Sequence, residues 1–186
     1  MSLGFVLPVT ASQAWIGPVD SSLLDGTEWE TAAEAHEVDP WLLYAISLEE
    51  SARLDREDQL LRPYPYTIHY EGEVHQFDTR DGAVEKIERL ESAGAWNYDI
   101  GPLQINRYWH REAVQDPAEW LDVETSLDRA AEILAWGAKL YPEDVELAIG
   151  AYRSLDQETA LRYAEQVIKV WCQLPGDDAS WETACR

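Results

Sequence analysis

Apolar residues recur at helical spacing along most of the chain, which predicts a mainly α-helical protein. The first helix is expected over residues 28–36. A second helix should begin at Asp39-Pro40, because aspartate can cap the first backbone N–H groups and proline suits the first helical position. Since strands and helices do not alternate, a parallel sheet is not expected. Further helices are predicted between Thr79 and Gly94, and over about residues 124–140, 142–153 and 157–173.

Two prolines, Pro63 and Pro65, interrupt this helical pattern. The segments 67–70 and 74–77 then flank Glu71-Gly72-Glu73, an arrangement typical of a β-hairpin. The predicted fold class is therefore mainly α, with one hairpin inserted between helices.

A chain of 186 residues has the size of one domain. Residues 1–26 are rich in glycine, proline and serine and are predicted to form an extended lead-in. Within them, residues 1–14 combine an apolar patch with small residues at the spacing of a signal-peptidase site, so they are interpreted as the remnant of an export signal. The folded domain should span residues 27–174, with the hairpin inserted at about 63–79, and residues 175–186 should form a C-terminal tail.

The net charge of the chain bears on which partners it can bind. There are 36 acidic and 14 basic side chains, which give a net charge of −22. Such a field repels the phosphates of nucleic acids and the surface of anionic lipids, so binding to either is not expected. No run of 18 apolar residues is present, so no membrane span is predicted. An adaptation to high salt and an ordinary solubilising surface both account for the acidity.

The two cysteines, Cys172 and Cys185, lie close together near the C-terminus. In an exported protein they would form a disulfide, worth on the order of 3 kcal/mol for a loop of this size. In a reducing cytosol they would remain two thiols. The four histidines are scattered and make no metal-ligand pattern with the acids or thiols, so neither a metal site nor a cofactor is expected.

The helix after Pro40 ends in two adjacent acids, Glu49 and Glu50. Glu50 follows apolar residues at helical spacing, so its side chain should lean onto an apolar surface. Burial there would raise the pKa of the carboxyl towards the value that a general acid needs near neutral pH. Glu49 follows apolar residues at the same spacing, so periodicity alone does not choose between the two acids.

A polar segment at residues 97–106 is the second candidate for chemistry. Gly101 permits a tight backbone path, and the amide groups of Gln104 and Asn106 suit the acetamido and hydroxyl groups of a sugar. Asp99 in the same segment is the candidate for a second carboxylate beside the glutamates.

Taken together, these segments resemble the soluble lytic transglycosylases, whose catalytic domain has a lysozyme-like fold. That family typically carries a proline followed by an apolar helix ending in Glu-Ser, then Gly-Leu-Met-Gln, then Ala-Tyr-Asn. The corresponding segments here are residues 40–51, 101–106 and 151–154, within a resemblance that spans roughly residues 30–172. It implies that Glu50, not Glu49, is the catalytic acid and base.

The resemblance also implies roles for other residues. Tyr152 would help to hold the catalytic glutamate. Pro102, Leu103 and Arg153 depart from the usual apolar residue, methionine and asparagine, which puts individual substrate contacts in doubt. The residues expected to bind substrate are Ser51, Trp96, Asp99, Gly101, Leu103, Gln104, Asn106 and Trp109.

The inserted hairpin and the Tyr152-Arg153-Ser154 sequence are similar to the subgroup associated with conjugative elements and envelope-spanning secretion machines. The implied partners are peptidoglycan glycan strands and such a machine. The implied location is the periplasm or cell envelope.

The implied reaction uses one carboxylate to cleave the bond between N-acetylmuramic acid and N-acetylglucosamine, with formation of a 1,6-anhydro ring. Two alternatives stay open: a goose-type-like muramidase, which hydrolyses the same bond, and a weakly active peptidoglycan-binding module. Among the nine tryptophans, Trp96 and Trp109 flank the glutamine motif and are candidates for stacking on sugars. Trp41, Trp136 and Trp171 sit in apolar helical patterns and are predicted to belong to the core.

Overall fold

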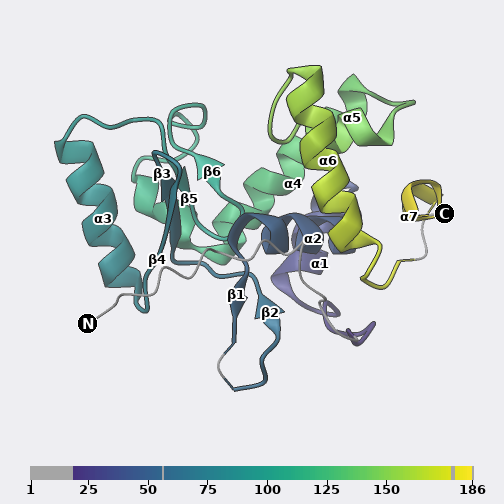
Figure 1. The fold of residues 1–186 in the computed structure, drawn as a ribbon, viewed down its shortest axis with the longest axis horizontal. Helices are drawn as coiled ribbons and strands as arrows, with labels where there is room; N and C mark the ends of the chain where they lie inside the picture. Colours follow the sequence, from purple (N-terminus) through teal and green to yellow (C-terminus); the bar gives the residue numbers. More distant parts are fainter. Residues whose placement is uncertain (1–18, 56, 177–178, 186) are drawn as a thin grey trace.

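A computed structural model describes residues 19–55, 57–176 and 179–185, and the fold is mainly α with small antiparallel sheets (Figure 1). The four-stranded sheet and the helix α3 lie on one side of the molecule, the two-stranded sheet lies below its middle, and the other α-helices occupy the middle and the opposite side. The helices are α1 (Glu28–His36), α2 (Pro40–Ser51), α3 (Arg80–Ser92), α4 (Val123–Leu140), α5 (Val145–Gly150), α6 (Gln157–Trp171) and α7 (Ala179–Cys185), with a 3-10 helix, η2 (Pro117–Leu121). The strands are β1 (Arg53–Leu54), β2 (Leu61–Arg62), β3 (Thr67–Tyr70), β4 (Glu73–Gln76), β5 (Asp99–Ile100) and β6 (Ile105–Asn106).

The helix α2 forms the centre of the core, because nearly all of its residues are buried, including the unbroken run from Trp41 to Leu48. Its predicted start is confirmed: Asp39 Oδ1 accepts a hydrogen bond from the backbone N–H of Leu42 at 2.5 Å. The same oxygen accepts from Trp171 Nε1 at 3.1 Å. One aspartate therefore caps α2 and also ties it to the end of α6, which fixes the direction in which α2 carries its C-terminal glutamates.

Most of the predicted helices are confirmed, since α1 and α2 start and end close to their expected residues and Thr79 caps α3 through Gly82 N at 3.2 Å. The helix expected over 142–153 is shorter, because Asp144 caps it at Leu147 N and the chain turns after Gly150. Residues 1–26 were expected to form an extended lead-in, but residues 21–26 form turns, and Leu24 is buried in the core. The interpretation of residues 1–14 as an export signal lies outside the described residues.

The predicted hairpin is present as β3 and β4, but it belongs to a larger sheet in the order β4-β3-β5-β6. Ile68 on β3 pairs with Ile100 on β5, which in turn pairs with Ile105 on β6. All three isoleucines are buried, so the core side of this small sheet is apolar. The sequence did not predict β5 and β6, because strands of two residues are too short to show alternation. Their pairing places the polar segment after residue 97 beside the hairpin.

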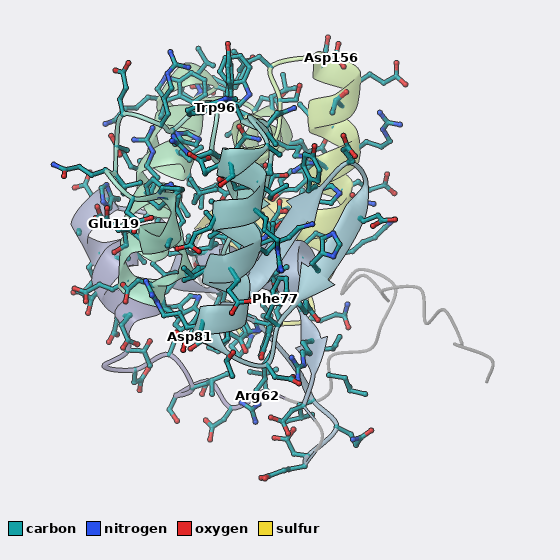
Figure 2. All side chains as sticks on the ribbon, turned by 90° about the vertical axis from the view of Figure 1, so that its left-hand side faces the viewer. Arg62, Phe77, Asp81, Trp96, Glu119 and Asp156 are labelled. Atoms are coloured by element: carbon teal, nitrogen blue, oxygen red, sulfur yellow. A yellow bond between two sulfur atoms is a disulfide. The ribbon has the colours of Figure 1, made fainter. Side chains whose placement is uncertain are left out.

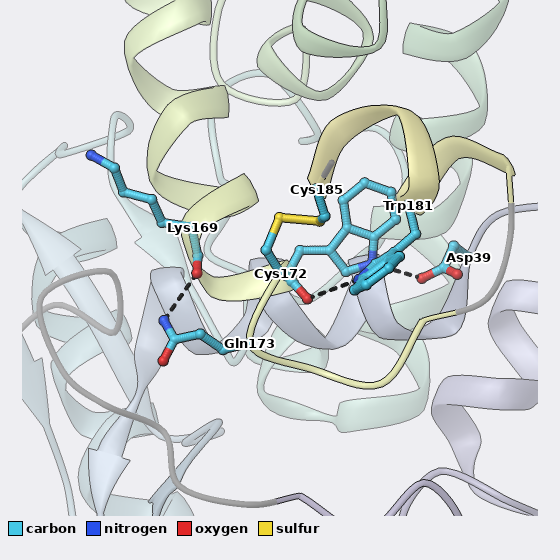
Figure 3. The surroundings of a disulfide bond; sticks show 7 residues. Asp39, Lys169, Cys172, Gln173, Trp181 and Cys185 are labelled. Atoms are coloured by element: carbon cyan, nitrogen blue, oxygen red, sulfur yellow. Dashed lines mark hydrogen bonds between the residues drawn. A yellow bond between two sulfur atoms is a disulfide. The ribbon is translucent and has the colours of Figure 1, made fainter.

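The C-terminal tail folds back over the end of α6 (Figure 3). Cys172, just after α6, forms a disulfide with Cys185 in α7. Trp181 Nε1 donates a hydrogen bond to the carbonyl oxygen of Trp171 at 3.3 Å. The tail is therefore held by a disulfide and by a half-buried indole hydrogen bond, at the end of α6 that also contacts Asp39.

Across residues 19–55, 57–176 and 179–185, no helix combines the length and the apolar character that crossing a membrane requires.

Candidate active-site cleft

A cleft of about 980 Å³ opens between the four-stranded sheet, the helix α4 and the segment 151–155 that follows α5. Side chains reach it from the end of α2, the β3–β4 turn, the β5 and β6 strands, one face of α4 and residues 151–155. Clefts of this size hold organic ligands or several sugar rings.

Glu50 is the α2 residue that lines this cleft; Glu49 is not among the described residues that do. The pKa of Glu50 is raised from 4.5 to about 7, mainly by burial and to a smaller extent by the carboxylates of Asp99 and Glu49. The guanidinium of Arg153 and the hydroxyl of Tyr163 act in the opposite direction. A carboxyl that keeps partial solvent contact and titrates near neutral pH can both donate and accept a proton in one catalytic cycle.

Two tyrosines lie beside Glu50, and they make different contacts. Tyr152 lines the cleft, but its hydroxyl donates a hydrogen bond to the carbonyl oxygen of Leu103 at 2.7 Å. The Tyr152 ring stacks on the ring of Tyr163, with 6.1 Å between centroids. Tyr152 therefore holds the 101–104 turn, and the role that the resemblance implies for it, to help hold Glu50, stays a prediction.

The hydroxyl of Tyr163, on α6, is close enough to Glu50 to lower the pKa of the glutamate. This hydroxyl is buried, and it has no partner of good hydrogen-bond geometry among the residues that the structure describes. The sequence did not single out Tyr163, because it occupies an apolar position in the pattern of α6 and resembles an ordinary core residue. Only the packing of α6 against α2 brings it to the glutamate.

The residue after Glu50 has a structural role. Ser51 is buried and does not line the cleft. Its hydroxyl donates to the carbonyl oxygen of Pro102 at 2.8 Å and accepts from the backbone N–H of Tyr64 at 3.1 Å. Ser51 was expected to bind substrate; the structure shows it joining the end of α2 to the turn after β5.

That turn depends on Gly101, which has a φ of +84° and lies against the backbone of η2. A Cβ atom at this position would lie 1.9 Å from the carbonyl oxygen of Trp120, so no other residue fits. Gln104 lines the cleft, but its amide nitrogen donates to the carbonyl oxygens of Thr67 at 3.1 Å and Gly101 at 2.7 Å. Leu103 is fully buried. Residues 101–104 thus form a turn whose contacts are mainly with the rest of the protein, beside Glu50.

Asp99 lies in the cleft at the centre of a polar cluster. It accepts a hydrogen bond from Asn106 Nδ2 at 2.7 Å, and its other oxygen lies 3.4 Å from His69 Nδ1 and 3.6 Å from Arg153 Nη1. The ion pair with Arg153 links the sheet to the segment after α5. The pairing of β3 with β5 places His69 opposite Asp99, where it lines the cleft and is half-buried.

One face of α4 forms the opposite side of the cleft and carries Arg129, Glu132, Ile133 and Trp136. Trp136 was predicted to lie in the core, which is wrong, because its side chain is 46% exposed. The buried residues of α4 form a stripe from Ser126 to Gly137. Trp136 lies outside this stripe, so its side chain points away from the core. The predictions that Trp41 and Trp171 are buried are confirmed.

Of the two tryptophans that were candidates for stacking on sugars, only one lines the cleft. Trp109 lines the cleft, is 75% exposed and meets Tyr108 edge to face. Trp96 is 48% exposed, but it does not line the cleft; the guanidinium of Arg107 lies 5.0 Å from its ring. Figure 2 shows Trp96 beyond the C-terminal end of α3, at the opposite end of that helix from Asp81.

In the part of the chain that the structure describes, no three His, Cys, Asp or Glu side chains gather in a way that could hold a metal ion. Comparison with protein-family models found no match for the chain, and comparisons with curated proteins and with solved structures found none either. Function therefore has to be argued from the cleft.

Proposed function

We propose that this protein is a peptidoglycan lytic transglycosylase with a lysozyme-like fold. The observation that supports this most strongly is the placement of Glu50 at the end of a buried helix, in a cleft, with a pKa of about 7. The three segments that carry the family resemblance also contact one another beside this cleft: Glu50 lies in the last turn of α2, the hydroxyl of Ser51 donates to the carbonyl oxygen of Pro102, and the hydroxyl of Tyr152 donates to that of Leu103.

In the proposed reaction, protonated Glu50 donates its proton to the glycosidic oxygen between N-acetylmuramic acid and N-acetylglucosamine, and the bond from that oxygen to the muramic C1 breaks. The muramic 2-acetamido group stabilises the cationic C1. Ionised Glu50 then takes the proton of the 6-hydroxyl, whose oxygen bonds to C1 and closes the 1,6-anhydro ring. Arg153 favours the ionised form of Glu50, so it stabilises the enzyme between the two proton transfers.

The proposal includes an exported location, in the periplasm or cell envelope, where the polymer is found. The disulfide between Cys172 and Cys185 suits an oxidising compartment. Association with a secretion or conjugation machine is the part of the proposal that depends on the hairpin β3–β4 and its likeness to that subgroup.

A muramidase is the second candidate, because a second carboxylate, Asp99, lines the same cleft. In a hydrolase it would activate a water molecule for attack on C1, and the product would carry a reducing end. The oxygens of Asp99 are already contacted by Asn106, His69 and Arg153, which favours the route with one carboxylate.

The test is mass spectrometry of the soluble products released from purified sacculi by the wild type, Glu50→Gln and Glu49→Gln. Products ending in 1,6-anhydromuramic acid are expected, and Glu50→Gln should lower their release by about 10²–10⁴-fold, the usual contribution of a general acid and base. Glu49→Gln is the matched control and should retain most of the activity. Reducing ends would establish the muramidase, and no release at any of several salt concentrations would leave a binding module.

A further inference from the structure

The disulfide between Cys172 and Cys185 joins the end of α6 to α7 (Figure 3). None of the described residues after α6 lines the cleft, so this part of the protein takes no part in the proposed proton transfers. Both cysteines are half-buried rather than enclosed, so a small thiol can reach their sulfurs. Such a disulfide opens when a thiolate attacks one of the two sulfurs, and it closes again in the presence of an oxidant.

We propose that the Cys172–Cys185 disulfide is a redox switch that controls how firmly α2 is held, so that the cleft is fully formed in the oxidised protein only. On oxidation the two thiols lose two protons and two electrons and the S–S bond forms, while the disulfide of a small-molecule or protein oxidant is reduced to two thiols. Reduction by a dithiol is the reverse reaction. That the activity controlled in this way is glycan cleavage rests on the proposed function. The control of α2 does not.

The first support is that α7 depends on the rest of the protein for its stability. It has seven residues, fewer than an isolated helix needs in water. Trp181 packs against Gly176, where an added Cβ atom would lie 2.2 Å from the indole ring. Because Cys172 and Cys185 are 13 residues apart in the sequence, their bond keeps α7 close to its docking site at a high local concentration. Reduction removes this constraint, so α7 is then free to leave.

The second support is a chain of hydrogen bonds that leads from α7 to α2. Trp181 Nε1 donates to the carbonyl oxygen of Trp171 at 3.3 Å, and Trp171 Nε1 donates to Asp39 Oδ1 at 3.1 Å. The same aspartate oxygen caps α2 by accepting from the backbone N–H of Leu42. Figure 3 shows the disulfide, Trp181 and Asp39 in one small region. Trp171 is fully buried, so departure of α7 would let water compete for its bond to Asp39.

The third support is that two elements of the cleft meet this region. The helix α2 begins at the Asp39 cap and carries Glu50 into the cleft. The helix α7 also contacts α5, which leads directly into the cleft-lining residues 151–155. A helix whose cap is weakened opens first in its initial turn. A change at the disulfide therefore reaches the residues around Glu50, although the disulfide itself lies outside the cleft.

The experiment is hydrogen–deuterium exchange of the purified protein, oxidised and after native reduction by millimolar dithiothreitol. In the reduced protein, the amides of residues 179–185 and 42–45 should exchange at least about tenfold faster, which is the sign of local opening. The amides of α3 should keep their rates. Product release from sacculi should fall at least about fivefold, because a displaced catalytic group lowers the rate. Removal of dithiothreitol and reoxidation by oxidised glutathione should restore both.

Two variants separate the disulfide from other effects. Cys172→Ser/Cys185→Ser should exchange like the reduced protein and should not respond to dithiothreitol, so it is the control for the reagent. Trp171→Phe removes the indole N–H that binds Asp39. In this variant, reduction should still speed exchange at residues 179–185, but exchange at residues 42–45 should no longer depend on it.

Faster exchange confined to residues 179–185 in the reduced wild type would overturn the proposal, since α2 would not respond. Loss of protection throughout the fold, α3 included, would overturn it too, because the disulfide would then support the whole protein. The same holds for a disulfide that dithiothreitol does not reduce. Exchange needs no substrate, so control of α2 can be found when sacculi release no products, and anhydro products can be found when α2 does not respond.

Discussion

At one side of the cleft Glu50 is enclosed by protein and its pKa is raised, whereas along α4 Arg129 is paired with Glu132 and the ring of Trp136 is exposed. On the first side, burial raises the pKa of Glu50 to about 7 and its partner Arg153 is shared with Asp99. On the second, Arg129 is satisfied by Glu132 and His110. The two sides of one cleft therefore differ physically: one holds a desolvated carboxyl with a raised pKa, and the other presents paired charges and an exposed aromatic ring.

The two sides also differ in what they do to stability. A carboxyl that must ionise where protein replaces water destabilises the fold, as functional groups often do. Paired surface charges such as Arg129 and Glu132 contribute little in either direction. Three predictions test this contrast, beginning with the largest effect.

The turn at residues 101–104, which packs beside Glu50, should not tolerate a side chain at Gly101. Gly101→Ala would place a Cβ atom 1.9 Å from a backbone oxygen at a φ of +84°. We expect a loss of unfolding free energy on the order of 3 kcal/mol or more, because backbone and not a flexible side chain must move. Urea unfolding followed by circular dichroism would measure it.

Gly94→Ala is the control for this variant. Gly94 has a φ of +74°, but a Cβ atom there would meet nothing within 4 Å. Its replacement should cost about 1 kcal/mol, from the left-handed conformation alone. Similar losses for Gly101→Ala and Gly94→Ala would show that the turn yields more easily than its close contact implies.

Replacement of Glu50 by glutamine should stabilise the protein at alkaline pH. The unfolded carboxyl loses its proton near pH 4.5, whereas the folded one holds it until about pH 7, so wild-type stability falls as pH rises through this window. Above pH 7 the variant should be more stable by on the order of 2–3 kcal/mol, and below about pH 4.5 the difference should vanish. Urea midpoints at pH 4, 6 and 8 would measure this.

Glu49→Gln makes the same change of charge and serves as the comparison, since Glu49 is not among the described residues lining the cleft. If Glu50→Gln were no more stable than wild type at pH 8, or if the gain did not depend on pH, ionisation of Glu50 would not destabilise the folded protein as its burial implies.

Arg153 and Asp99 should move the pH dependence of activity in opposite directions. The alkaline limb of kcat/KM reports the pKa of Glu50, because the acid must be protonated. Arg153→Gln removes a positive charge that lowers this pKa, so the limb should move to higher pH; Asp99→Asn removes a negative charge that raises it, so the limb should move to lower pH. Rates on soluble glycan fragments between pH 5 and 9 would show both shifts.

An exposed acid outside the cleft, Glu124, provides the control, since Glu124→Gln changes the net charge equally and should leave the limb in place. Movement of both cleft variants in the same direction would contradict this account of the charges around Glu50.

Local signals account for the elements that could be predicted. The cap at Asp39, the cap at Thr79 and the turn between the hairpin strands each involve residues a few positions apart, and all three are present. The end of α5 was placed too late, because the chain turns after Gly150 although apolar residues continue. The site was predicted less completely: Glu50, Asp99 and Trp109 reach the cleft, whereas Ser51, Leu103 and Trp96 do not line it.

By itself, the sequence determined the mainly helical class, the hairpin and a pair of adjacent acids at the end of an apolar helix, because capping, turn formation and periodicity act between near neighbours. Only the tertiary structure decided which acid faces the cleft, and only it brought Tyr163 and Arg153 to Glu50 and turned Trp136 outwards. These outcomes depend on how α2, α4, α6 and the sheet pack together. A contact between two residues far apart in the chain cannot be recognised from the local sequence around either residue.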